Sequence, residues 1–264
     1  MKIIDTETAI IGGGASGLAA AIAASRYGCG NVTIFEKMQR VGKKILSTGN
    51  GRCNLTNRNI SPADYTGDTE LLSYISPDID NAEDFFSSLG LICRADDNGR
   101  VYPYSNAATS VLDALRFAAD SSGIRTICDF TVSEITKTKH GFIITDGETQ
   151  VKAKRVIIAA GGKAAPSLGS SGEGYELCRS LGHSVTRLFP ALAPVRTDIE
   201  LVKSLKGLRV AADATLISGG RGIDRQSGEV QFTDGALSGI CIFNLSAKAA
   251  EYINNGEISL DTAP

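Results

Sequence analysis

The sequence lacks the features that mark membrane, secreted and nucleic-acid-binding proteins. No stretch approaches the roughly 18 consecutive apolar residues of a membrane-spanning helix, and Met1–Asp5 lacks the long apolar run of a secretory signal. The formal net charge of -2 gives no electrostatic argument for a nucleic-acid partner. We therefore expect a cytoplasmic protein with no membrane partner and no nucleic-acid partner.

Histidine and paired cysteines are also scarce. His140 and His183 are the only histidines, and the six cysteines include no CxxC pair. This pattern favours neither a metal site, nor a redox dithiol, nor a Ser/His/Asp catalytic set. With 264 residues, of which 42% are hydrophobic and 21% charged, the chain has the composition of a globular protein of one large domain or two.

Glycine is abundant, and its first cluster carries a recognisable motif. The apolar strand Thr8–Ile11 runs into a GxGxxG turn that opens an alanine-rich segment, predicted to be a helix over residues 15–27. In such a turn Gly12 allows the tight bend, Gly14 lets the backbone approach a pyrophosphate, and Gly17 lets the helix pack closely on the strand. The helix N-terminus directs free N–H groups at the anion.

The next strand supports a βαβ dinucleotide-binding unit. The predicted strand Asn31–Phe35 ends in Glu36, about 20 residues beyond the glycines, where a carboxylate can accept hydrogen bonds from ribose hydroxyls. The loop Gly42–Asn57 follows, with Lys44 and Arg52 among glycines and short polar side chains that suit anion binding. So long a polar loop favours FAD over NAD alone, because the pyrophosphate, ribityl chain and isoalloxazine edge must all be held.

The pattern of the remaining chain predicts further αβ structure, followed by a segment of antiparallel β-strands. Three strands, at 126–136, 141–146 and 150–160, form a predicted β-meander, and a glycine-rich segment at 169–175 leads into a helix. After Pro190 the pattern becomes antiparallel β, which places a domain boundary near residue 190. Other predicted elements are two amphipathic helices within 69–90 (one carrying Leu71, Leu72 and Ile75), a hairpin at 91–104, a helix at 107–121 and a final strand at 257–260.

Several ordered motifs resemble the HI0933-like flavoprotein family, which includes aminoacetone oxidase family FAD-binding enzymes and BaiN-type NAD(P)/FAD-dependent oxidoreductases. The most specific is GNGRCNLTN at residues 49–57, and the resemblance covers almost the whole chain. The other motifs are IGGGASG at 11–17, GKK at 42–44, GSSGEGY at 169–175, LGH at 181–183, PALAP at 190–194 and FTDGALSG at 232–239.

The resemblance implies an α/β fold with these parts: a Rossmann-like FAD-binding domain with a three-stranded β-meander (residues 1–190) and the start of a β-rich, substrate-covering second domain (residues 191–264). The family also continues to a closing segment of type GGYN(L/I)QxAxxSG, which is missing before Pro264, so we expect a C-terminally truncated form. The resemblance implies these cofactor-binding residues: Gly12, Gly14, Ala15, Ser16 and Gly17 at the pyrophosphate; Glu36 and Lys37 at the adenosine ribose; Lys44, Ser47, Gly49, Gly51, Arg52, Cys53 and Asn54 on the flavin side; Val132, in the first meander strand, at the adenine; and Ala160, Gly161 and Gly162 at the strand end. Ala160 stands where the family has threonine, which removes one side-chain hydrogen bond.

The leading hypothesis is an FAD-dependent oxidoreductase that exchanges hydride between the flavin and a small organic substrate, with NAD(P)H or oxygen as redox partner. The residues name no general acid or base. Cys53 is a candidate neighbour of the isoalloxazine ring, as a packed or a reactive thiol, and Tyr175 and His183 are candidate proton donors. Two alternatives stay open: a truncated dinucleotide-binding module without turnover, and an NAD-dependent dehydrogenase.

Overall fold

The protein divides into two compact units, Met1–Val185 and Thr186–Pro264. The structure, a computed structural model, describes residues 2–61, 64–65 and 82–255. The predicted helix with Leu71, Leu72 and Ile75 and the predicted strand at 257–260 lie outside the described residues.

The first unit is built on a six-stranded sheet in the order β6-β2-β1-β9-β8-β7. Strands β6, β2, β1 and β9 run parallel, and β8 and β7 continue the sheet antiparallel. The elements of the sheet layer are β1 (Lys2–Ile11), β2 (Val32–Phe35), β6 (Arg125–Ile127), β7 (Glu134–Thr138), β8 (Gly141–Thr145) and β9 (Thr149–Ile158). The predicted α/β Rossmann-type fold is therefore confirmed.

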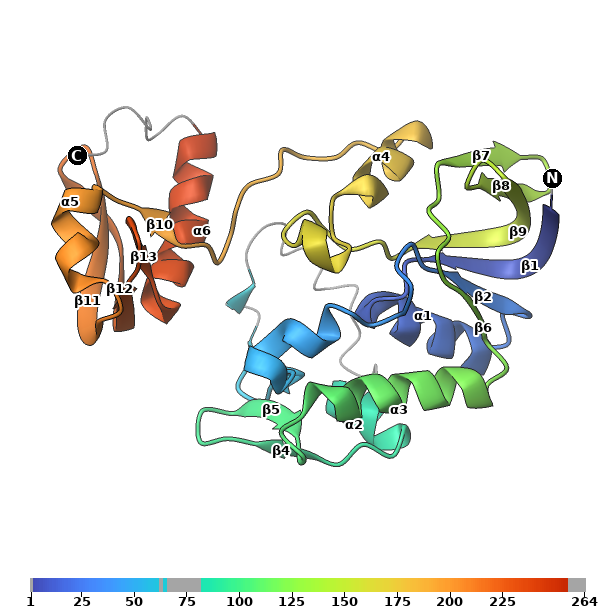
Figure 1. Ribbon diagram of the computed structural model, residues 1–264, viewed down its shortest axis with the longest axis horizontal. Helices are drawn as coiled ribbons and strands as arrows, with labels where there is room; N and C mark the ends of the chain where they lie inside the picture. Colours follow the sequence, from blue (N-terminus) through green and yellow to red (C-terminus); the bar gives the residue numbers. More distant parts are fainter. Residues whose placement is uncertain (1, 62–63, 66–81, 256–264) are drawn as a thin grey trace. The chain divides into compact units, whose positions relative to one another are not determined.

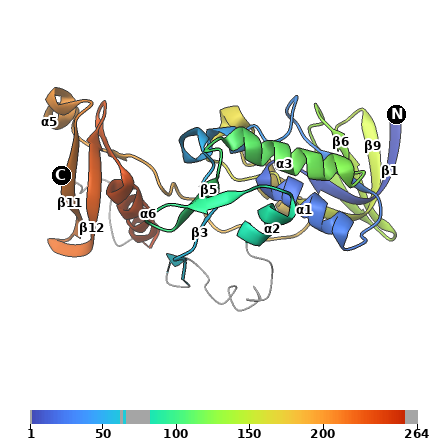
Figure 2. The same cartoon turned by 90° about the horizontal axis from the view of Figure 1, so that it is seen from below.

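Helices cover one face of this sheet, and a further helix lies on the other (Figure 1). Helices α1 (Ala15–Arg26) and α3 (Ala108–Ser121) lie side by side on the first face, as Figure 2 also shows. Ile10 and Ile34 are fully buried against them. On the opposite face Phe35 packs with Phe130 and with residues of α4 (Glu173–Ser180). Burial on both faces explains why β2 and the last residues of β1 are almost continuously apolar, whereas β9 includes exposed Lys and Arg side chains.

A small three-stranded sheet, in the order β3-β5-β4, follows the polar loop. Its strands β4 and β5 form the hairpin that the sequence predicts between residues 91 and 104. The elements of this part are the 3-10 segment η1 (Ile45–Gly51), β3 (Thr56–Asn57), α2 (Ala82–Ser88), β4 (Cys93–Ala95) and β5 (Arg100–Pro103). Strand β3 is formed by the last two residues of the GNGRCNLTN motif and pairs with β5, so the hairpin holds the end of that motif in place.

The predicted first strand of the meander, residues 126–136, is wrong as a single strand. Strand β6 ends at Ile127, and β7 begins only at Glu134. Between them Asp129 has a φ of 55°, in the left-handed region, which an extended strand cannot contain. Phe130 N–H then donates to Glu36 O at 3.0 Å, so the segment crosses the end of β2 instead of extending β6. Val132 consequently lies in an irregular segment just before β7 and not in a strand.

The second unit contains a four-stranded antiparallel sheet in the order β10-β13-β12-β11. One face packs on α6 through Val230, Cys241 and Ile242. The elements are β10 (Val195–Arg196), α5 (Ile199–Val202), the 3-10 segment η5 (Lys203–Leu205), β11 (Arg209–Ser218), β12 (Arg221–Phe232), β13 (Ala236–Ser238) and α6 (Ile240–Asn254). The antiparallel β structure predicted after Pro190 is present in this unit.

Candidate functional site

A cavity of about 420 Å³ lies at the carboxyl ends of the parallel strands in the first unit. This is the edge at which open α/β sheets bind ligands. The glycine turn between β1 and α1 forms one wall, and the polar loop after β2 forms another. Of the predicted site residues, these line the cavity: Gly12, Gly14, Ala15, Ser16, Glu36, Lys44, Cys53, Asn54, Ala160 and Gly161.

The glycine turn has the geometry that the motif requires. Gly12 has a φ of 105°, and a Cβ there would lie 2.5 Å from Ala159 O, so only glycine fits between the two strand ends. A Cβ on Gly17 would lie 1.8 Å from Gly12 O, which shows that this glycine allows α1 to approach the turn. A Cβ on Gly14, by contrast, would meet nothing within 4 Å. The backbone at Gly14 is therefore open to a ligand in the cavity.

Glu36 joins the glycine turn to the end of β2. Its carboxylate accepts a hydrogen bond from Gly13 N–H at 2.6 Å and another from Met38 N–H at 2.8 Å. The residue is only 9% exposed yet lines the cavity. Each carboxylate oxygen can accept a second bond, so the group that shapes the turn can also receive ribose hydroxyls.

We expect Glu36→Gln to lower the free energy of unfolding by about 2 kcal/mol, because the amide nitrogen cannot accept a hydrogen bond and leaves a buried N–H unpaired. Urea unfolding followed by circular dichroism measures this. Glu7→Gln is the control, since Glu7 pairs with Lys154 at the surface. Equal stability of wild type and Glu36→Gln would contradict the role assigned to the carboxylate.

A second, smaller hollow lies beside the cavity and shares Gly12, Glu36 and Ala160 with it. Lys37 and Val132 line this hollow, together with Phe130. Lys37 and Val132, which were predicted to lie near the adenosine, are thus brought together at one end of the site. A ligand that fills both hollows must be extended, as a dinucleotide is.

Three lysines of the chain after β2 contact the segment from η4 (Pro166–Leu168) to the start of α4, and residues 168–170 of this segment form another wall of the cavity. Lys37 Nζ lies 2.6 Å from Glu173 Oε1 and 2.7 Å from Ser171 Oγ. Lys43 Nζ donates to Ser167 O at 3.0 Å, and Lys44 Nζ donates to Ser170 Oγ at 2.8 Å. Four contacts made by these three lysines therefore fasten this wall to the chain after β2.

Desolvation alone would raise the pKa of Glu173, but hydrogen bonds from Lys37, from Ser171 and from its own backbone outweigh it. The pKa falls from its usual 4.5 to about 2. A lowered pKa in the folded state means that the ion pair stabilises the fold fully above about pH 4.5 and that this stabilisation is lost as the pH falls toward 2.

We accordingly expect the stability difference between wild type and Glu173→Gln to be present at pH 6 and to disappear near pH 2. Because the Glu173 side chain is 44% exposed, the difference at pH 6 stays below about 1 kcal/mol. Chemical unfolding at several pH values between 6 and 2 measures it. A difference that is constant across this range would refute the assignment.

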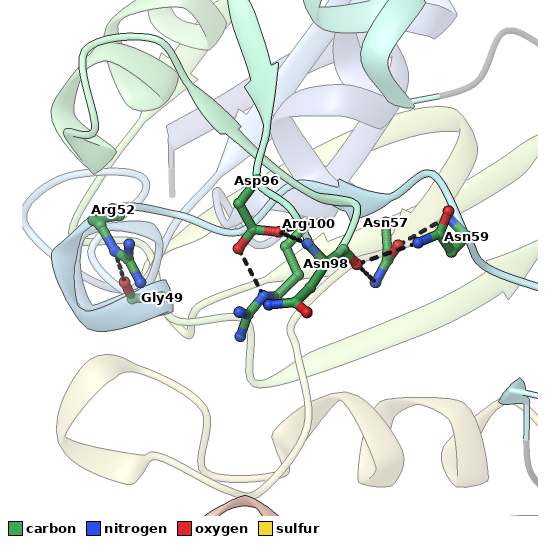
Figure 3. A network of polar contacts seen from close by, with 7 residues as sticks. All are labelled: Gly49, Arg52, Asn57, Asn59, Asp96, Asn98 and Arg100. Atoms are coloured by element: carbon green, nitrogen blue, oxygen red, sulfur yellow. Dashed lines mark hydrogen bonds and ion pairs between the residues drawn. The ribbon is translucent and has the colours of Figure 1, made fainter.

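Only some residues of the GNGRCNLTN segment line the cavity. Cys53 is 8% exposed, lines the cavity and has a φ of 59°, and all six cysteines are free. The Arg52 side chain points elsewhere. Its Nε donates to Gly49 O at 3.4 Å (Figure 3). Its guanidinium lies 4.5 Å from the centre of the Tyr102 ring.

The end of this segment is fastened to the β4–β5 turn by a polar network (Figure 3). Asp96 accepts hydrogen bonds from the backbone N–H groups of Asn98 and Arg100 at 2.9 Å, and Asn98 O accepts from the side chains of Asn57 and Asn59 at 3.4 Å. The structure therefore uses these polar side chains to shape the loop and the hairpin.

Six predicted site residues do not line either hollow: Gly17, Ser47, Gly49, Gly51, Arg52 and Gly162. The candidate proton donors Tyr175 and His183 do not line them either; His183 borders a separate depression with Lys137 and Phe142. Lining residues that sequence analysis did not assign to the site include Arg40, Lys43, Phe86, Val111, Leu115, Gly169 and Ser170. The signal for Ser170 was present in the glycine-rich GSSGEGY motif, whereas Phe86, Val111 and Leu115 carry only a helical apolar pattern.

The described residues contain neither a cluster of metal-binding side chains nor a membrane-spanning helix. In residues 2–61, 64–65 and 82–255 there is no group of three or more His, Cys, Asp or Glu side chains that could hold a metal ion. Within the same ranges, every helix is too short or too polar to cross a bilayer.

The chain has relatives among characterised proteins and solved structures. It is 38% identical over 252 residues to a 3-dehydro-bile acid delta(4,6)-reductase of Clostridium scindens, and that alignment covers 94% of this chain and 61% of the relative. It is 26% identical over 253 residues to a ribosomal RNA dihydrouridine synthase of Haemophilus influenzae, with 91% of this chain and 61% of the relative covered. The chain thus spans about three fifths of the length of these relatives.

Among solved structures, the open conformation of a flavocytochrome c3 fumarate reductase matches with a TM-score of 0.58 at 19% identity, over 79% of this chain and 47% of the other. This likeness concerns the fold. The model of the HI0933-like protein Rossmann domain matches residues 6–257, which is nearly the whole chain. The chain therefore belongs to the HI0933-like family.

Proposed function

We propose that this chain is the FAD-binding part of an oxidoreductase that reduces a carbon–carbon double bond conjugated with a carbonyl group in a small molecule, with a nicotinamide nucleotide as electron donor. The observation that carries the proposal is the cavity at the glycine turn, where the backbone at Gly14 is open and Glu36 stands at the adjacent strand end. When bound, FAD supplies the hydride-transfer chemistry. The residues of the chain bind and orient it.

The cavity residues fit an extended dinucleotide. The open backbone at Gly14 and the start of α1 suit the pyrophosphate, Glu36 suits the ribose, and Lys37 and Val132 border the hollow beyond it. On another side Ile45, Leu55, Phe86, Val111 and Leu115 give an apolar lining. A mostly apolar surface with a few fixed polar groups is typical of cofactor sites.

The substrate class is supported by what the relatives are named for. A 3-dehydro-bile acid delta(4,6)-reductase acts, by its name, on double bonds conjugated with a ketone, and a dihydrouridine synthase forms a hydrogenated uracil ring. Both add hydrogen to a double bond conjugated with a carbonyl group. The higher identity to the first relative, 38% against 26%, and the net charge of -2 favour a small molecule over RNA.

An anaerobic experiment tests this function. We expect the purified chain mixed with FAD to show a bound-flavin spectrum, to be bleached by NADPH or NADH, and to regain its colour when a 3-oxo-4-ene steroid is added. Bound flavin that neither nucleotide bleaches would contradict the nicotinamide donor and favour a binding module without turnover. Binding of NAD without any binding of FAD would favour a plain dehydrogenase.

A further inference from the structure

We propose that Lys44 and Ser170 together form a phosphate clasp, which grips a phosphate of the bound dinucleotide in the cavity that the glycine turn also borders. This inference rests on the proposed function, since it concerns the same cofactor. It adds Ser170 to the binding residues and gives Lys44 a defined partner. The clasp would hold the ligand between two walls that are far apart in the sequence.

The position of Ser170 is fixed by its surroundings. The residue is 4% exposed, and its backbone N–H donates to Ala165 O at 3.0 Å. A Cβ on Gly161 would lie 3.0 Å from Ser170 Oγ, so the glycine at the end of β9 leaves room for this hydroxyl. Ser170 and Lys44 both line the cavity that Gly14 borders. The hydroxyl is thus held at the cavity wall.

The three lysines after β2 that contact this wall differ in their partners. Lys37 pairs with the carboxylate of Glu173, and Lys43 donates to the carbonyl oxygen of Ser167. Lys44 contacts only the hydroxyl of Ser170, and within the described part of the chain no carboxylate pairs with it. An uncompensated ammonium group therefore stands at the cavity.

The clasp has hydrogen-bond donors left for a ligand. An ammonium group has three donors, and the contact with Ser170 uses one of them. Ser170 Oγ accepts in that contact, so its own O–H remains able to donate. Glu36, the carboxylate that also lines the cavity, already accepts bonds from two backbone N–H groups. Donors of this kind suit an anion with several acceptor oxygens, such as a phosphate.

Equilibrium binding of ADP to the purified chain tests the clasp. We expect Ser170→Ala and Lys44→Met each to weaken ADP binding about 10-fold, because charge-assisted hydrogen bonds to phosphate are lost. We expect the double variant to lose less than the product of the two single effects, because the two side chains act on one phosphate. Adenosine, which has no phosphate, should bind wild type and variants equally.

Ser167→Ala is the matched control. It removes a hydroxyl from the same wall but keeps the carbonyl that Lys43 contacts, so ADP binding should equal that of wild type. Wild-type ADP affinity in Ser170→Ala, or an equal loss for adenosine and ADP, would overturn the clasp while leaving FAD binding intact. A wild-type chain that binds neither ADP nor FAD would instead contradict the proposed function, and the clasp with it.

Discussion

Gly17→Ala is expected to destabilise the first unit by about 3 kcal/mol or more, which corresponds to a fall in melting temperature of roughly 6–12 °C. The added Cβ would lie 1.8 Å from Gly12 O and 2.9 Å from Gly12 C. Both are backbone atoms of a turn that is fixed by a hydrogen bond from Gly12 N–H to Phe35 O at 2.8 Å. Since the turn cannot move without breaking the end of the sheet, α1 must shift away. Thermal and urea unfolding measure the loss.

The neighbouring Gly14→Ala variant is the control for this stability measurement. Both variants add one methyl group to the same turn, but the Cβ at position 14 meets no atom within 4 Å. Its expected cost is about 1 kcal/mol or less, because Gly14 occupies the N-cap of α1, where alanine is less favourable than glycine. Equal destabilisation by the two variants would show that close packing at Gly17 is not what sets the position of α1.

Gly14→Ala is expected to weaken the binding of FAD strongly, although it changes the stability of the fold little. The open space at Gly14 is where a pyrophosphate would meet the backbone, so the methyl group would occupy part of the ligand's place. Steric costs of about 1–3 kcal/mol correspond to a loss of FAD affinity of roughly 5- to 150-fold. Isothermal titration with FAD measures it in a variant that keeps a near-wild-type melting temperature.

The reference for this binding measurement is a glycine remote from the cavity. A Cβ on Gly123 also meets no atom within 4 Å, and Gly123 follows α3 without lining either hollow. Its φ of 68° makes alanine cost some stability, but FAD affinity should stay at the wild-type value. Unchanged FAD affinity in Gly14→Ala would place the pyrophosphate elsewhere and contradict the account of the glycine turn.

The sequence predicted the parts of the fold that depend on local chemistry. The βαβ unit follows from apolar strands and from glycines whose roles are set by neighbours close in sequence, such as Gly12 and Gly17. The β4–β5 hairpin follows from its turn residues, and α3 from its apolar spacing. These features need little knowledge of distant segments, and the structure confirms them.

The parts that sequence analysis missed depend on contacts between distant segments. The break between β6 and β7 arises because Phe130 turns to pack on Phe35, with ring centroids 4.9 Å apart. Arg52 is drawn out of the cavity by Tyr102, which belongs to the later hairpin. Ser170 contacts Lys44, which lies 126 residues earlier in the chain, at the cavity. No periodicity or motif spacing encodes such pairings.

We expect the turn at Gly12–Gly17, together with Glu36, to bind an extended FAD molecule. Titration of the purified 264-residue chain with FAD, and with NAD in parallel, tests it most directly. We expect each chain to bind one FAD molecule and ADP to displace it. NAD should bind much more weakly than FAD. Absence of FAD binding by a folded chain, or FAD binding that ADP does not compete with, would contradict it.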